Sequence, residues 1–134
     1  MKRIGLVLCL GAACLAFAAT AGARASSHPT SVFFDDSNAQ VGDTTQLWVS
    51  GHVTSPSPNC VANRTVKLFF GYQTETAFRL VDVTKSSRNG EFGGVGPETR
   101  GGNEAVALKL KVLKKKFGPK HHRQTCNGAS TKIV

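Results

Sequence analysis

Most of this chain consists of short segments in which apolar and polar residues alternate. Two cysteines lie at either end of the central group of these segments. Cys60 comes just before the alternating segment 65–70, and Cys126 comes just before the final segment 129–134. Alternation with a period of two places the apolar side chains on one face of a β-strand. No helical period persists beyond the N-terminal region. The sequence therefore predicts an all-β protein with a single domain.

The N-terminus has the composition of a secretory signal peptide. Lys2 and Arg3 precede a long apolar stretch, and Ala23-Arg24-Ala25 gives the small–x–small pattern that signal peptidase cleaves. A membrane-spanning helix needs about 20 apolar residues, and Gly22 ends this run too early. We expect residues 1–25 to be a cleavable signal helix and the mature protein to have no transmembrane helix. The predicted location is secreted, either extracellular or in the cell envelope.

Cleavage of the leader would remove two of the four cysteines and leave Cys60 and Cys126. An exported chain with two cysteines is expected to pair them. The bridge would close a long loop, for which the loss of chain entropy in the unfolded state predicts about 4 kcal/mol of stabilisation.

The mature length fits one domain. We expect residues 26–44 to be an N-terminal segment with a candidate first strand, and residues 45–134 to be the folded domain.

Turn signals divide the mature chain into about seven short strands, a pattern typical of a β-sandwich. The expected strands are 32–34, 45–54, 65–70, 78–84, one that begins at Glu91, 105–113 and 129–134. Turns or loose connections are expected at 35–38, at Asn89-Gly90 and at 93–97, and a charged hairpin loop at 114–124. The residues predicted to form the core are Val49, Val53, Val66, Leu68, Leu80, Phe92, Leu108 and Leu110.

Four segments carry a family resemblance. They are Val49-Ser50-Gly51-His52-Val53, the run from Cys60 to Phe69, Leu80-Val81-Asp82-Val83-Thr84 and Arg88-Asn89-Gly90-Glu91-Phe92. Their order resembles the carboxypeptidase-regulatory-like domain of small secreted bacterial proteins. The resemblance covers residues 45–134 and implies an Ig-like or transthyretin-like (prealbumin-like) β-sandwich outside the cytosol. It implies no catalytic residue, because this domain is commonly an accessory module. Gly93-Gly94 departs from the family, which keeps an alternating strand there.

Positive charge collects in the C-terminal third of the chain. Cleavage of the leader would lower the formal net charge from +9 to +6, and every acidic residue lies at or before Glu104. The candidate anion-binding residues are Lys114, Lys115, Lys116, Lys120 and Arg123. Such a basic segment attracts anionic polymers by long-range electrostatics and counterion release. The alternative is a hairpin tip that improves solubility and blocks pairing at a sheet edge.

Trp48 lies on the polar side of its predicted strand and is a candidate exposed aromatic residue. It could stack on a sugar or anchor a partner, or the second sheet or a loop could cover it. His121-His122 lacks a third metal ligand and has cations beside it, which favours a solvated loop. Asn63-Arg64-Thr65 is formally a glycosylation sequon. We predict no catalytic residue, no metal site and no cofactor.

The predicted function is that of a non-enzymatic secreted or cell-surface module with a structural or interaction role. The alternative is an exported domain that binds an anionic polymer through its basic C-terminal hairpin. That polymer would be an acidic glycan, a teichoic acid or a phospholipid surface. The expected partner is an unknown protein or an anionic envelope polymer, with no specific nucleic acid. The protein is expected to be a monomer.

Overall fold

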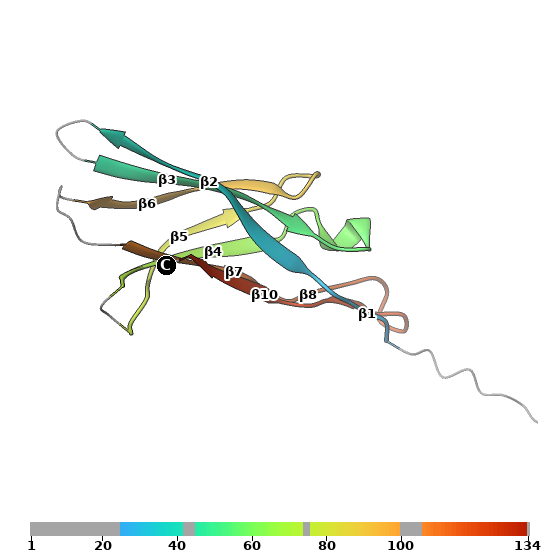
Figure 1. Cartoon of the computed structure of the whole chain (residues 1–134). Helices are drawn as coiled ribbons and strands as arrows, with labels where there is room; N and C mark the ends of the chain where they lie inside the picture. The colour runs from blue at the N-terminus through green and yellow to red at the C-terminus, as the bar shows by residue number, and fades with distance from the viewer. Residues whose placement is uncertain (1–24, 42–44, 74–75, 100–105, 134) are drawn as a thin grey trace, which may run out of the picture.

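The computed structural model describes residues 25–41, 45–73, 76–99 and 106–133, and within them the chain is all-β. The predicted signal peptide, residues 1–25, lies outside this part of the chain except for Ala25. No helix among the described residues is long and apolar enough to cross a membrane. The described strands form two larger sheets and one small sheet, and the larger sheets lie in separate layers (Figure 1).

The first of the larger sheets, called here the β3 sheet, has the strand order β2-β3-β6. Its strands are β2 (Ser31–Val41), β3 (Thr45–Thr54) and β6 (Glu91–Thr99), and all neighbours are antiparallel. The bounds of β3 match the predicted strand 45–54. Val49 and Val53 are buried on its inner face, whereas Trp48 is exposed on its outer face. The predicted alternation along β3 is therefore confirmed.

The second large sheet, called here the β4 sheet, has the strand order β10-β7-β4-β5. Its strands are β4 (Thr65–Tyr72), β5 (Arg79–Lys85), β7 (Val106–Val112) and β10 (Ala129–Ile133). All pairs are antiparallel, with Leu68 opposite Leu110 in the centre of the sheet. Alternating valine, leucine and phenylalanine residues give β4 and β7 one apolar face each, and this shared face is buried.

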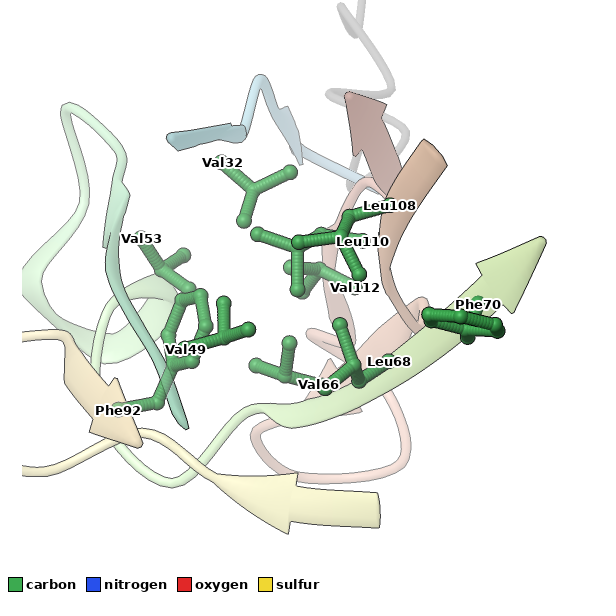
Figure 2. Close-up of a cluster of buried hydrophobic side chains, with 10 residues drawn as sticks. All are labelled: Val32, Val49, Val53, Val66, Leu68, Phe70, Phe92, Leu108, Leu110 and Val112. Carbon is green, nitrogen blue, oxygen red and sulfur yellow. The ribbon is translucent and has the colours of Figure 1, made fainter. Parts of the chain in front are cut away.

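The hydrophobic core lies where the inner faces of the two larger sheets meet. Figure 2 shows side chains of the β3 sheet pointing toward those of β4 and β7. The core residues are Val32, Val49, Val53, Val66, Leu68, Phe70, Phe92, Leu108, Leu110 and Val112. Seven of the eight predicted core residues are buried. Val32 belongs to the core as well, so the N-terminal segment is part of the same folded unit.

Gly51 leaves room for its neighbours on the two flanking strands of the β3 sheet, β2 and β6. A Cβ atom at this position would lie 2.6 Å from the ring of Phe92 and would also collide with the backbone carbonyl of Phe33. A larger residue would therefore displace either the neighbouring strand or a core side chain.

A disulfide joins Cys60 to Cys126, as predicted. Cys60 ends the short 3₁₀ helix η1 (Pro58–Cys60), and Cys126 ends β9 (Gln124–Cys126), with 5.3 Å between the two Cα atoms. β9 is the middle strand of the small sheet and pairs with β1 (Ser27–His28) and β8 (Lys115–Phe117). The bridge therefore attaches the small sheet to the loop that leads into β4.

Arg64 is a buried cation that sequence analysis did not identify. It is fully inaccessible to solvent, and its guanidinium donates hydrogen bonds to the carbonyls of Cys60 (2.6 Å), Leu113 (2.8 Å) and Asn127 (2.8 Å). Nη1 also donates to Thr30 Oγ1 at 3.1 Å. Burial lowers the pKa of Arg64 by desolvation. The side chain thus joins four separate segments beside the disulfide.

Two predicted connections are strands in the structure. Residues 35–38, predicted as a turn, continue β2, and residues 93–97, predicted as a loose connection, continue β6. Asx-rich and glycine-rich sequences favour turns locally, but hydrogen bonding to the central strand β3 holds both segments extended. The predicted loop at 114–124 is partly wrong as well, because β8 and the first residue of β9 lie within it.

Leu80 was predicted to be buried, and this prediction is wrong: the residue is 48% exposed on the outer face of β5. The cause is a bulge in the pairing of β5 with β4, where Leu68 lies opposite Asp82 but Phe69 lies opposite Leu80. One extra residue, Val81, inverts the facing of the positions before it. Val81 packs against the core in place of Leu80.

Asn89-Gly90 forms the predicted tight turn, but its two strands do not pair with each other. β5 pairs with β4 and β6 pairs with β3, so the turn carries the chain from one sheet to the other. Gly90 has a φ of +91°, which a residue with a side chain rarely adopts. Away from the turn, Asp82 on β5 connects the two strands, because its carboxylate accepts a hydrogen bond from the amide of Val95 on β6 at 2.8 Å.

Candidate binding face

Four lysines on β4, β7 and β10 project from the outer face of the β4 sheet and are called here the lysine face. They are Lys67 on β4, Lys109 and Lys111 on β7, and Lys132 on β10. The inward positions on these strands hold core residues, so alternation sends the lysines outward. Neighbouring strands lie about 4.8 Å apart, which brings the four side chains into one compact patch.

The lysines of this face lie opposite one another in two cross-strand pairs. Lys67 is the register partner of Lys111, and Lys109 is the register partner of Lys132. Like charges directly opposite each other destabilise a sheet. In the described part of the chain, none of the four lysines forms an ion pair with an acidic side chain. The repulsion between the lysines is therefore not compensated by a described acidic side chain.

Aromatic and aliphatic side chains lie among the lysines. The ring of Phe78 lies under two ammonium groups, with Lys132 Nζ at 5.0 Å and Lys109 Nζ at 5.9 Å from its centroid. These are cation–π contacts, which orient the lysines without neutralising them. Phe69 lies opposite Lys109 on the same face, and the exposed Leu80 lies opposite Phe69. The face therefore offers both positive charge and apolar surface.

An open hollow of about 470 Å³ lies at the end of β7 next to this face. Lys111, Lys114, Gly128 and Ser130 are among the residues that line it. Lys111 belongs to the lysine face, and Lys114 is the first of the five predicted anion-binding residues. The hollow therefore joins the lysine face to the start of the basic hairpin.

The other four predicted anion-binding residues are not equivalent to one another. Lys115 is partly buried, and its Nζ donates a hydrogen bond to the carbonyl of Ala62 at 3.1 Å. Lys116 on β8, and Lys120 and Arg123 in the loop between β8 and β9, are exposed. The structure thus brings only Lys114 to the hollow beside the lysine face and turns Lys115 toward the backbone.

Trp48 is 48% exposed on the outer face of the β3 sheet. Its register partner on β6 is Val95, and Phe33, which is 47% exposed, lies on the same outer face. Phe33 stacks on the ring of His52, with 5.1 Å between the centroids. Two aromatic groups therefore lie on the side of the protein away from the lysine face.

Within the described residues, no group of three or more His, Cys, Asp or Glu side chains is arranged to hold a metal ion. His121 and His122 are exposed in the hairpin loop beside Lys120 and Arg123. Asn63, of the glycosylation sequon, is exposed just before β4 and has a φ of +53°.

The lysine face was not predicted from the sequence, because strand pairing assembles it. Outward-facing lysines at 109 and 111 are visible in the sequence, but Lys67 lies more than 40 residues earlier. Only the register of β4 against β7 places Lys67 and Lys111 together. The signal available in the sequence was a lysine at an outward position in each of two strands.

The chain matches no protein-family model, no curated protein and no solved structure.

Proposed function

We propose that this protein is an exported, non-enzymatic module that binds an anionic envelope polymer through the lysine face. The ligand class is a polymer with repeated phosphate or sulfate groups, such as a teichoic acid or an acidic glycan. The resemblance to carboxypeptidase-regulatory-like domains supports a transthyretin-like β-sandwich, and the leader-like N-terminus supports export. The disulfide is compatible with an oxidising compartment outside the cytosol.

One observation carries the proposal: the two cross-strand lysine pairs, Lys67–Lys111 and Lys109–Lys132. A sheet selected for stability alone avoids like charges at directly opposite positions. A bound polyanion would place negative groups between these ammonium ions and remove the repulsion. Binding would also release counterions from the polymer, which favours association at low salt.

The shape of the region favours a polymer over a small ligand. The lysines lie on the open outer face of a sheet, whereas sites for small molecules are usually concave and enclose most of the ligand. Neighbouring lysines on β7, at positions 109 and 111, are separated by about 6.6 Å along the strand. A flexible chain of anionic groups can contact several of them in succession and continue into the hollow at Lys114.

The test compares two triple variants that remove the same charge. One is Lys67→Ser/Lys111→Ser/Lys132→Ser on the lysine face, and the control is Lys116→Ser/Lys120→Ser/Arg123→Ser on the hairpin. Retention on immobilised teichoic acid and on heparin is measured at increasing salt. We expect the lysine-face variant to elute early and the control to elute close to wild type. The slope of log K against log salt should fall by about 0.7 per lost contact.

Three other outcomes of this test would each contradict polymer binding by the lysine face. Early elution of the hairpin variant alone would assign binding to the hairpin predicted from the sequence. Equal elution of all three proteins would exclude a specific anion-binding face and leave a structural module. Binding to anionic phospholipid vesicles without retention on either polymer would identify the ligand as a membrane surface.

A further inference from the structure

We propose that the outer face of the β3 sheet is a second binding site, which takes a neutral polysaccharide. The site is formed by two aromatic groups, with Ser50 of β3 and Gly93 of β6 between them. It lies on the opposite side of the core from the lysine face and does not depend on the function proposed for that face.

Trp48 and His52 mark the two ends of the site along strand β3. They are four residues apart and share one face of the strand, so about 13 Å separates them. Trp48 is 48% exposed beside Val95, and His52 carries the stacked ring of Phe33, which is 47% exposed. Aromatic rings with exposed faces at this separation can stack on different sugar rings of one chain.

Gly93 forms the floor between the aromatic groups. It is the register partner of Ser50, midway between Trp48 and His52. A Cβ atom placed on Gly93 would meet no described atom within 4 Å, so the space above the backbone is open there. A flat ligand can therefore approach the sheet closely at this position while its ends rest on the aromatic rings.

A bulge fixes the polar group at one end of the site. The pairing of β2 with β3 skips Asp35, which lies between the paired residues Phe34 and Asp36. The Asp35 carboxylate instead forms a hydrogen bond with His52 Nδ1 at 2.5 Å. Bulges frequently reorient a side chain next to a functional site. The hydrogen bond holds the imidazole in the orientation in which Phe33 stacks on it.

The charges on the outer face of the β3 sheet indicate which class of ligand it would bind. Its described outward positions include the carboxylates of Asp35 and Glu91 but no lysine or arginine. Carboxylates repel the polyanions that the lysine face attracts, and they accept hydrogen bonds from hydroxyl groups. Exposed aromatic rings combined with carboxylates and without cations therefore fit a neutral, hydroxyl-rich chain.

The test uses the fluorescence of Trp48, which is the single tryptophan of the chain. Hydroxyethylcellulose, a soluble β-1,3-glucan and a galactomannan are titrated into the purified protein. We expect at least one of them to shift the emission, with little dependence on salt. Affinity electrophoresis in gels that contain the same polysaccharide should then show at least about tenfold weaker binding for Trp48→Ala.

Gly93→Val is the second variant, because it fills the floor and leaves the fluorescent reporter in place. Valine suits a strand and meets open space here, so the protein should fold normally and lose the emission shift. The triple lysine-face variant should keep the shift, which separates this site from the anion-binding face. The proposal is overturned if no neutral polysaccharide shifts the emission, if both site variants bind like wild type, or if only heparin, lipid vesicles or a protein produces the response.

Discussion

The guanidinium of Arg64 donates a hydrogen bond to the carbonyl of Asn127 at 2.8 Å, although 63 residues separate the two along the chain. The same side chain holds the carbonyls of Cys60 and Leu113. Carbonyl groups outside a strand ladder need another hydrogen-bond donor when they are shielded from water. Arg64 supplies that donor at the point where the disulfide, β7 and β10 come together.

Replacement of Arg64 by methionine should therefore destabilise the fold strongly. The change keeps the apolar stem but leaves one buried and two part-buried carbonyls without this donor, each at a cost of about 1–3 kcal/mol. We expect a loss of about 3 kcal/mol or more in the free energy of unfolding, measured by urea denaturation. Arg79→Met is the control, because Arg79 is exposed on an edge strand. Similar stability of the two variants would contradict the structural role of Arg64.

The Cys60–Cys126 disulfide should make a large contribution to the free energy of unfolding. Intact mass under non-reducing conditions should be two hydrogens below that of the reduced chain. The double variant Cys60→Ser/Cys126→Ser should lose about 4 kcal/mol, because the bridge restricts a long loop in the unfolded chain. Reductant should destabilise wild type and leave the double variant unchanged. Two alkylatable thiols in the purified protein would disprove the bridge.

Leu68 and Leu80 provide a matched test of strand facing. Leu68 is 1% exposed in the core, and Leu80 is 48% exposed beyond the β5 bulge. Leu68→Ala should cost about 2–5 kcal/mol, because it leaves a cavity. Leu80→Ala should change stability by less than about 0.5 kcal/mol. Thermal or urea unfolding measures both, and a large cost at Leu80 would place the bulge elsewhere.

Lys111→Glu should separate binding from stability on the lysine face. Glutamate would lie opposite Lys67 and turn a repulsive pair into an attractive one, which stabilises a sheet by about 0.2–1 kcal/mol. Retention on teichoic acid should fall in the same variant. Lys116→Glu is the control, because its register partner is Thr125. A stability gain that persists unchanged at high salt would argue against the electrostatic cause.

The sequence alone determined the strand type, the inner and outer faces of β3, β4 and β7, and the disulfide. Each of these features follows from a local pattern or from a residue count. The patterns are alternation with a period of two and the turn residues, and the count is that of the two cysteines left after the expected cleavage. This is why residues 45–54 and seven of the eight predicted core residues agree with the structure. The Asn89-Gly90 turn was predictable for the same reason, because its backbone requires glycine.

The tertiary structure decided what local patterns cannot carry. The bulges at Val81 and Asp35 depend on pairing with a neighbouring strand. The first places the Leu80 side chain on the outer face of the sheet, and the second directs the Asp35 carboxylate to His52. Glycine-rich and Asx-rich segments became strands because β3 supplied hydrogen-bond partners on both sides. The lysine face and the aromatic face exist only through cross-strand register, which joins residues that are distant in the sequence. Register is a property of paired strands, so no single segment could reveal either surface.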